Sequence, residues 1–426
     1  MSYPLSIGFA VIAGLLMTRL GNKLKLPDVT SYLITGVLLG PCVLGLLGME
    51  GIGFTSFEFV EGLSWFSNLA LGFIAFAIGS EFRLSELKKT GSAAVTIGII
   101  QAVFTTLVVD LVMVAVHVMF PHSLTLADAI VLGAIASATA PAATLMVVRQ
   151  YKAHGDVTST LLPVVALDDA VGLILFAISF GIAQALNSGA VSMFNVLVAP
   201  LLEIVFSLIL GAILGYGLTH MARRFHSRRN RISMIVGYLV LSTALCTIKF
   251  ELGSAEVGFS ALLVNMMLGT VFCNCCKSSA DLMDRADQWS APFMVLFFVL
   301  SGAELNIFTL ANPIVLIICV LYIVSRCLGK YYGARYSSKI THSPAMVQKY
   351  LGITLFPQAG VALGMASQVG AQMGPDGQLI RDVVLSSVLV YEIIGPSLTK
   401  WALTKAGEIH AKSEDDPDEA PLPACK

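Results

Sequence analysis

Charged side chains are scarce in this chain of 426 residues. Asp, Glu, Lys and Arg make up only 12% of the sequence, whereas apolar residues make up 56%. Soluble globular domains carry about 25% charged residues, because polar side chains have to cover a surface that faces water. A water-soluble protein of this length is therefore excluded, and the mean hydropathy of +0.82 predicts a polytopic membrane protein.

Three further absences narrow the class. Neither sign of charge is in excess, since 26 Lys and Arg residues stand against 27 Asp and Glu residues, and this balance gives no indication of nucleic-acid binding. The eight cysteines show no paired framework, and length and hydropathy exclude a secreted disulfide scaffold. The sequence contains neither a G-x-G-x-x-G nor a Walker motif, so it indicates no nucleotide-binding domain and no ATP-driven motor.

Long apolar runs recur along the whole chain. A membrane-spanning helix needs about 20 mostly apolar residues, because it must satisfy its own backbone hydrogen bonds across about 30 Å of hydrocarbon. The sequence contains thirteen such runs, which we number in chain order as expected spans. They cover approximately residues 4–20, 28–48, 64–82, 91–117, 126–149, 160–186, 194–222, 232–250, 256–274, 288–309, 313–335, 347–370 and 380–404.

Basic residues are distributed unevenly between the connecting segments. Segments after odd-numbered spans, with the adjoining helix ends, contain 23 Lys and Arg residues, whereas those after even-numbered spans contain only Lys249 and Arg381. Because positive charges stay on the cytoplasmic side, this pattern predicts an N-terminus outside and a C-terminus in the cytoplasm. The first span has no basic region before it and no small-residue cleavage site after it, so we expect an uncleaved helix.

Three pairs of spans carry similar short sequences at a constant offset of seven spans. Residues 79–81 in span 3 match residues 302–304 in span 10, and residues 36–40 in span 2 match residues 265–269 in span 9. Spans 5 and 12 each contain a proline within an apolar run. Because seven is odd, paired spans cross the bilayer in opposite directions. The sequence therefore predicts an inverted repeat of spans 1–6 and 8–13, with span 7 as linker.

The two prolines, Pro141 and Pro357, predict discontinuous helices. A proline inside a helix removes a backbone hydrogen bond and clashes with the preceding turn. Both prolines lie among small residues, residues 136–143 in span 5 and Ala359 and Gly360 in span 12. We expect the half-helix ends of the two spans to meet near the membrane centre and to form an ion site.

Two adjacent carboxylates, Asp168 and Asp169, lie in the first third of span 6. Ionisable residues within a bilayer are costly and mark function by default. Two neighbouring carboxylates in apolar surroundings cannot both stay charged cheaply, so we expect at least one to bind a proton or a hard cation at physiological pH. Competition between proton and cation for one site is sufficient for exchange. Since adjacent helical residues point about 100° apart, only one of the pair needs to face the ion.

Other polar residues of the spans are candidates for supporting roles. Arg326 in the middle of span 11 is always charged and needs an anion. Asp168 is the first candidate for its partner, and Glu392 in span 13 is the second. Lys330, one turn further on, is a further candidate for a charge partner, although it is expected to extend toward the cytoplasmic face. The expected hydroxyl and amide ligands of the ion are Thr139, Ser137 and Gln358.

The remaining membrane carboxylates are expected to have structural roles. Asp110 and Glu203 lie nearer the outer ends of their spans, where they would be solvated or structural. Glu81 and Glu304 occupy repeat-related helix ends, where helix-end or interface pairing is the favoured interpretation.

With these features the sequence resembles the family of monovalent cation:proton antiporters. It is most similar to the second branch of this family, which contains exchangers of sodium or potassium for protons. The resemblance covers essentially the whole chain up to the acidic tail, and the Asp pair after the broken helix is specific. The segments that carry it are residues 25–27, 31–33, 36–41, 137–141, 167–169, 325–330 and 355–362.

The resemblance implies an all-α polytopic fold of about thirteen transmembrane helices with two discontinuous helices, the sodium/proton antiporter fold. It also implies a homodimer in a bacterial inner membrane, in which an ion-transporting core moves against a dimerisation scaffold in an elevator-like alternation. The implied parts are a scaffold (residues 1–90 and 231–309), a core (91–186 and 313–405), a linker helix (194–222) and a short, acidic, disordered cytoplasmic tail (406–426).

The resemblance further implies roles for single residues. Asp169 would be the main ion ligand and proton carrier, Asp168 would pair with Arg326, and Thr139 would coordinate the cation. One-for-one exchangers often read Thr-Asp-Pro where this chain has Thr139-Ala140-Pro141, and electrogenic relatives pair an Asp-Asp couple with Lys, so the stoichiometry is open. The regulatory nucleotide-binding domain of the glutathione-gated potassium efflux branch has no counterpart in this sequence, so we expect no such control.

The sequence thus predicts a secondary active exchanger of Na⁺, or of Li⁺ or K⁺, for H⁺, which is not an enzyme and needs no cofactor beyond the transported ions. Alternatives are a K⁺/H⁺ antiporter and a cation-coupled symporter of an organic anion, which would need a basic cavity beyond Arg326. An intramembrane aspartyl protease would place its carboxylates on two facing helices and carry a Gly-x-Gly-Asp motif. Asp168 and Asp169 are instead adjacent, and this motif is absent. A non-transporting sensor is the last alternative.

Overall fold

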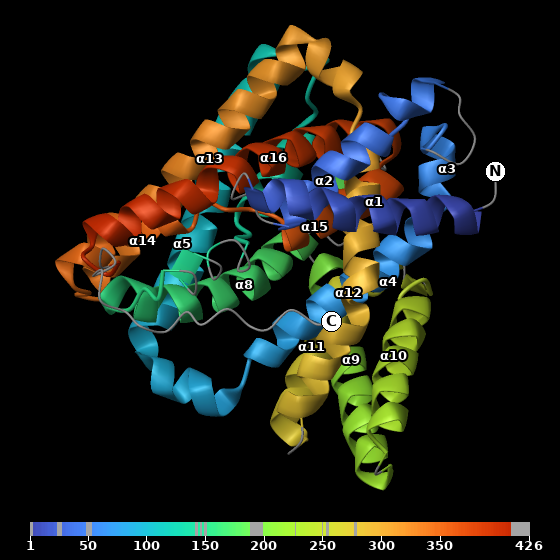
Figure 1. The fold of residues 1–426 in the computed structure, drawn as a ribbon. Helices are drawn as coiled ribbons and strands as arrows, with labels where there is room; N and C mark the ends of the chain where they lie inside the picture. The colour runs from blue at the N-terminus through green and yellow to red at the C-terminus, as the bar shows by residue number, and fades with distance from the viewer. Residues whose placement is uncertain are drawn as a thin grey trace.

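The computed structural model describes residues 3–23, 28–47, 53–140, 144, 147–148, 151–187, 199–225, 227–248, 250–252, 255–276 and 279–409. This part of the chain is nearly all helical (Figure 1). The elements are α1 (Tyr3–Lys23), α2 (Asp28–Leu39), η1 (Leu44–Leu47), α3 (Phe57–Glu61), α4 (Ser64–Glu81), α5 (Leu84–Met119), α6 (Leu126–Ala136), α8 (Asp156–Asn187), α9 (Ala199–Arg224), α10 (Arg228–Leu245), β1 (Phe250–Leu252), β2 (Ala255–Val257), α11 (Ala261–Cys275), α12 (Ser279–Ala303), η3 (Ile307–Ala311), α13 (Pro313–Ile340), α14 (Ala345–Thr354), α15 (Gly360–Gln372) and α16 (Gly374–Lys405).

Each expected span overlaps, over its described residues, with one helix or with an interrupted helix. Seven helices of the described part are long and apolar enough to cross a membrane by length and composition. Among the shorter apolar helices are α6 and α11. The all-α polytopic class is therefore confirmed, whereas the number thirteen and the direction of each span stay predictions.

The boundary between expected spans 8 and 9 was placed wrongly. Hydropathy predicts helices over residues 232–250 and 256–274, but α10 ends at Leu245 and α11 begins only at Ala261. Between them, β1 and β2 form a short antiparallel pair in which Phe250 lies opposite Val257. A hydropathy window counts apolar residues whatever their backbone conformation, so it could not distinguish this hairpin from helix ends.

Two groups of helices build the molecule (Figure 1). In one group α5 packs along α13, and α6, α8, α14, α15 and α16 contact this pair or one another. In the other group α2 packs on α1 and α12, and α4 packs on α11, which also contacts α9. Helices α9 and α10 lie side by side and project together at one side of the molecule in Figure 1.

Glycines permit the closest helix contact in the second group. A Cβ atom added at Gly36 of α2 would lie 2.0 Å from the carbonyl oxygen of Val299 in α12. Conversely, a Cβ added at Gly302 of α12 would lie 2.2 Å from the carbonyl oxygen of Leu33. Only glycine allows two helix backbones to approach so closely, as is common at helix contacts in membranes.

Helices α4 and α11 cross in the same way. A Cβ at Gly79 would lie 1.9 Å from the carbonyl oxygen of Met266, and one at Gly269 would lie 2.2 Å from that of Phe76. In the predicted repeat α2 corresponds to α11, and α4 corresponds to α12. The contact of α2 with α12 therefore corresponds to the contact of α11 with α4, as this repeat predicts. The crossings align Gly36 with Gly269, one helical turn away from the match seen in the sequence.

The chain just after α16 is folded, contrary to the expectation of a tail that is disordered from residue 406. Glu408 is 5% exposed, and its carboxylate accepts hydrogen bonds from the backbone N–H groups of Val157 (2.6 Å) and Thr158 (2.9 Å) at the start of α8. The first N–H groups of a helix have no intrahelical partner, and a carboxylate satisfies them well. Glu408 therefore anchors the start of α8, and residues 410–426 lie outside the described residues.

Candidate ion-binding site

Two interrupted helices meet in the interior of the protein. Helix α6 ends at Ala136, and the chain continues without helical structure to Ala140. Helix α14 ends at Thr354, and residues 355–359 separate it from α15. The N–H group of Ala140 donates a hydrogen bond to the carbonyl oxygen of Pro357 over 2.9 Å. The backbones of the two breaks are therefore joined directly.

The interruption of span 12 lies where the sequence predicted it. Pro357 lies inside the non-helical segment, and Gly360 is the first residue of α15. In span 5 the non-helical segment begins after Ala136, and the predicted break residue Pro141 lies outside the described residues.

Arg326 of α13 is completely buried and bridges the two breaks. Its guanidinium donates hydrogen bonds to the carbonyl oxygens of Ala136 (2.9 Å), Ala138 (2.7 Å) and Phe356 (2.6 Å). Its Cζ atom lies 4.5 Å from the centre of the Tyr391 ring, a cation–π distance. Interrupted helices leave carbonyl groups without helical partners, and the planar fork of arginine offers several donors in fixed directions. Arg326 therefore satisfies backbone groups of both interrupted helices.

This geometry corrects the predicted partners of Arg326. Among the described residues, it makes no ion pair with Asp168 or Glu392, and backbone carbonyl groups take the place of both carboxylates. Glu392 is 1% exposed, and its carboxyl lies beside the side chain of Thr30 in α2. The sequence reveals the depth of an arginine in a span, but it does not reveal carbonyl groups left free by a break elsewhere.

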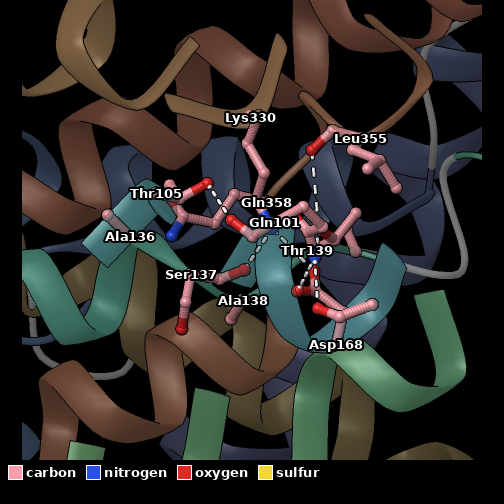
Figure 2. A network of polar contacts seen from close by, with 12 residues as sticks. Gln101, Thr105, Ala136, Ser137, Ala138, Thr139, Asp168, Lys330, Leu355 and Gln358 are labelled. Atoms are coloured by element: carbon pink, nitrogen blue, oxygen red, sulfur yellow. Dashed lines mark hydrogen bonds and ion pairs between the residues drawn. The ribbon is translucent and has the colours of Figure 1, made fainter. Parts of the chain in front are cut away.

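Lys330 is the charge partner of Asp168 (Figure 2). Its Nζ lies 2.7 Å from Oδ2 of Asp168, and both side chains are fully buried. The amide of Gln101 donates to Oδ1 of Asp168, and the hydroxyl of Thr139 donates to Oδ2. Three donors from three other segments thus hold this carboxylate in place, which offsets the cost of burying its charge.

The predicted extension of Lys330 toward the cytoplasmic face is therefore wrong. Its ammonium also donates to the carbonyl oxygen of Ser137 and to Oε1 of Gln101, the latter over 3.2 Å. Lys330 lies one turn after Arg326, and residues four apart on a helix share a face. Its side chain thus enters the same polar region, where acceptors replace the water that an extended side chain would reach.

Asp169 follows on α8 and is 1% exposed. The ammonium of Lys330 is within electrostatic range of both Asp168 and Asp169. A Cβ atom at Gly172, three residues on, would lie 2.9 Å from Oγ of Ser137, so α8 packs directly against the end of α6. The structure therefore brings the predicted Asp pair to the interrupted helix of span 5.

Further oxygen atoms lie around the two breaks. Gln358 is fully buried, and its Nε2 donates to the carbonyl oxygen of Ile135 (2.9 Å) and to the hydroxyl of Tyr322 (3.3 Å). Its Oε1 accepts no hydrogen bond within the described part of the chain. The hydroxyl of Ser137 donates to the carbonyl oxygen of Ala134 over 2.7 Å and keeps its lone pairs. Oxygen donors of this kind suit a hard monovalent cation.

No group of three or more His, Cys, Asp or Glu side chains is gathered as a metal centre within the described residues. The oxygen atoms at the two breaks are thus a mixed set of carboxylate, hydroxyl and amide oxygens.

Two residues of the site were missed in the sequence. Gln101 bonds both Asp168 and Lys330, and Tyr391 covers Arg326. Gln101 had a readable signal, since it is a lone amide in the apolar run of residues 95–104. Tyr391 had none, because aromatic residues are common in spanning helices.

The other carboxylates have structural surroundings. Asp110 packs against α6, where a Cβ at Gly133 would lie 1.8 Å from its Oδ1. Glu304 forms an ion pair with Arg381 over 3.4 Å, which agrees with the predicted interface pairing. Glu203 is half-buried on α9, and the side chain of Glu81 lies outside the described residues.

An all-helical membrane protein with two interrupted helices that meet beside buried carboxylates belongs to the class of secondary ion transporters. Residues 7–405 match the family model described as "Sodium/hydrogen exchanger, transmembrane", and the chain belongs to this family. It is thus a cation/proton antiporter and an integral membrane protein, not an enzyme.

Individual relatives support the same family. The chain is 24% identical over 411 residues to the Na⁺/H⁺ antiporter NhaS4 of Synechocystis sp., with 94% of each chain covered. It is 25% identical over 403 residues to the Na⁺/H⁺-K⁺ antiporter GerN of Bacillus cereus, with 92% of each covered. The fold is similar to that of the sodium proton antiporter MjNhaP1 from Methanocaldococcus jannaschii, with a TM-score of 0.74 at 18% identity, covering 95% of this chain and 97% of that one.

Proposed function

We propose that the protein exchanges Na⁺ for H⁺ across the membrane, and that Asp169 alternately holds the proton and the cation. The observation that carries this proposal is the buried Asp168, whose carboxylate is held by Lys330, Gln101 and Thr139. A carboxylate held by three donors serves as a fixed charge. We assign the exchange step to the neighbouring carboxylate, Asp169, which is equally buried and which the resemblance to the antiporters implies as the proton carrier.

The charges of the site favour competition between proton and cation. Asp168 and Lys330 form a neutral ion pair, and the guanidinium of Arg326 is held by carbonyl groups of the two breaks. An ionised Asp169 then contributes one carboxylate charge. One proton or one monovalent cation neutralises this charge. Because a net charge is costly inside a membrane protein, the empty site is disfavoured, and departure of one ion is coupled to arrival of the other.

The breaks supply the remaining ligands. Carbonyl groups at the end of α6 and between α14 and α15 are occupied by Arg326, so they do not compete for the cation. Oε1 of Gln358 and the hydroxyl groups of Thr139 and Ser137 remain as candidate neutral oxygen ligands at the two breaks. Neutral oxygens and one exchangeable carboxylate suit a weakly held Na⁺, with Li⁺ and K⁺ as competitors.

We further propose that transport proceeds by alternating access. The group of α5, α6, α8 and α13–α16 holds the candidate site, whereas the group of α1, α2, α4, α11 and α12 is joined by glycine contacts. The first group would move as a core against the second as a scaffold, which would form a homodimer. The N-terminus outside and the C-terminus in the cytoplasm follow from the distribution of basic residues.

Everted membrane vesicles test the proposal. Vesicles with the wild-type protein are acidified by respiration, and addition of Na⁺ should release protons and dequench a pH-sensitive dye. Asp169→Asn removes the exchangeable charge and should abolish this dequenching. Asp281→Asn, on an exposed ion pair of α12 with Arg285, is the matched control and should exchange like the wild type.

Equal dequenching in the Asp169→Asn variant would refute the assignment of the site. Absence of dequenching with the wild type for Na⁺, Li⁺ and K⁺ alike would refute cation/proton exchange by this chain under those conditions. GerN is named as a Na⁺/H⁺-K⁺ antiporter, so a larger response to K⁺ than to Na⁺ would favour the second candidate function, K⁺/H⁺ antiport.

A further inference from the structure

A polar cavity of about 180 Å³ lies apart from the candidate ion site. Its walls come from the start of α4 with the preceding α3, from the end of α12, and from the facing ends of α15 and α16. The charged side chains that line it are Glu61, Glu304, Arg381 and Asp382. Since a water needs about 10–15 Å³ of such space, the cavity has room for several waters.

One ion pair joins the two helix groups across this cavity. Arg381 at the start of α16 lies 3.4 Å from Glu304, which follows the last residue of α12, and their side chains are 18% and 11% exposed. Beside this pair, the N–H group of Asn306 donates to Oδ1 of Asp382 over 3.3 Å. Two polar contacts thus connect the same two segments, and both face the cavity.

The two sides of this ion pair belong to different groups of helices. Glu304 extends from α12, whose backbone is locked to α2 at Gly36 and Gly302. Arg381 extends from α16, which packs on the half-helices α14 and α15. A displacement of one group against the other must therefore separate Glu304 from Arg381, whereas contacts within each group persist.

The distribution of basic residues assigns this face to the outside of the membrane. Expected spans 10 and 12 end here and expected spans 3 and 13 begin here, and Arg381 is one of only two basic residues in segments after even-numbered spans. The positive-inside rule predicts such scarcity on the outer side. The cavity therefore lies where an outer mouth between core and scaffold would open.

We propose that the Glu304–Arg381 ion pair is the outer gate contact of the transport cycle, which rests on the alternating access proposed above. The pair closes the mouth in this conformation and breaks whenever the core opens to the outside. The pair lies at the edge of a polar cavity, so it is weaker than the fully buried pair of Lys330 and Asp168 and can be broken in every cycle. A deeply buried pair would hold the two groups too firmly.

Opening of this gate also prepares the mouth for a cation. Glu61, Glu304, Asp382 and Arg381 carry three negative charges and one positive charge, so the charged groups of the cavity sum to −2. Once Arg381 moves away with α16, which also carries Asp382, Glu304 faces water without its basic partner. A cleft of one sign concentrates ions of the opposite sign, so the opened mouth would attract cations.

The test measures how often the mouth opens. Ser67 lines the cavity and is 5% exposed, so we introduce Ser67→Cys and label it with a membrane-impermeant maleimide in right-side-out vesicles. The parent protein without this cysteine sets the background. Glu304→Gln and Arg381→Gln, each in the Ser67→Cys protein, should raise the labelling rate about two- to fivefold, the range expected for loss of a screened ion pair.

A charge exchange separates gating from a loss of folding. The double variant Glu304→Arg with Arg381→Glu restores an ion pair of reversed direction and should return the labelling rate toward that of the Ser67→Cys protein. Glu58→Gln, on an exposed position of α3 near the cavity, is the matched control and should leave the rate unchanged.

Different outcomes overturn different proposals. If wild-type vesicles exchange cations for protons but neither single variant changes the labelling rate, the gate is refuted and the proposed function stands. A charge exchange that labels as fast as the single variants also refutes the gate. If the wild type shows no exchange at all, the proposed function fails, whatever the labelling rates.

Discussion

Replacement of Arg326 by methionine tests the most specific structural assignment of the site. Methionine keeps the apolar length of the side chain and removes the guanidinium. Three hydrogen bonds of 2.6–2.9 Å to the carbonyl oxygens of Ala136, Ala138 and Phe356 are lost. A hydrogen bond to a charged donor contributes about 1.5–3 kcal/mol, and an orphaned buried acceptor carries a desolvation penalty of about 1–3 kcal/mol.

Water that enters the space left by the guanidinium can donate hydrogen bonds to these carbonyl oxygens, and it thereby offsets part of the lost free energy. We therefore expect Arg326→Met to lower the free energy of unfolding by about 4 kcal/mol, less than the sum of the three bonds. Unfolding entropy is about 2.1 cal/mol/K per residue, so for 426 residues this corresponds to a decrease in melting temperature of about 5 °C.

Thermal unfolding of the purified protein in detergent measures this decrease. Arg335→Met, on an exposed position of the same helix, is the matched control and should change the melting temperature by less than about 1 °C. An Arg326→Met variant as stable as the Arg335→Met control would refute the assignment of Arg326 as the bridge between the two interrupted helices.

Two further substitutions test the site and the fold. Lys330→Met removes the ammonium beside Asp168 and leaves this buried carboxylate without its ion-pair partner, so we expect at least a tenfold loss of exchange in everted vesicles, since breaking a buried pair costs about 3–5 kcal/mol. The exposed Lys339→Met is its control, and wild-type exchange by Lys330→Met would show that this ion pair is dispensable. Gly79→Ala places a Cβ 1.9 Å from the carbonyl oxygen of Met266 and should destabilise the protein by about 1–3 kcal/mol in the same thermal assay. The control Gly8→Ala has open space around its Cβ and should not destabilise the protein. If Gly79→Ala were as stable as Gly8→Ala, the result would argue against the close α4–α11 contact.

Several parts of the fold were predictable because their signals are local. Hydropathy located the apolar helices, since twenty apolar residues in sequence are sufficient to define a membrane helix, although some predicted ends differ from the observed ones by up to nine residues. Pro357 and Gly360 predicted the interruption of span 12, because a proline removes a helical hydrogen bond wherever it occurs. The β1–β2 hairpin was not predictable in this way, because Phe250 and Val257 are as apolar in a strand as in a helix.

The partners of the charged residues were only partly predictable. The sequence located Asp168, Asp169, Arg326 and Lys330 within spans, but it assigned Arg326 to Asp168 and Lys330 to the cytoplasmic face. Both assignments failed for one reason, because the choice between two basic residues one turn apart depends on acceptors that other segments supply. Arg326 donates its hydrogen bonds to carbonyl groups of the breaks, and Lys330 forms the ion pair with Asp168.

The sequence by itself determined that this protein lies in a membrane, that two of its helices are interrupted, and that an Asp pair follows the first interruption. These properties follow from local signals, namely the apolar composition, the positions of the prolines and the scarcity of charged residues. None of these signals depends on contacts with distant residues. Only the tertiary structure decided which basic residue neutralises Asp168, that Gln101 belongs to the site, and that Glu304 faces Arg381. Such pairs join residues from about 70 to more than 200 positions apart, so they exist only once the helices have packed.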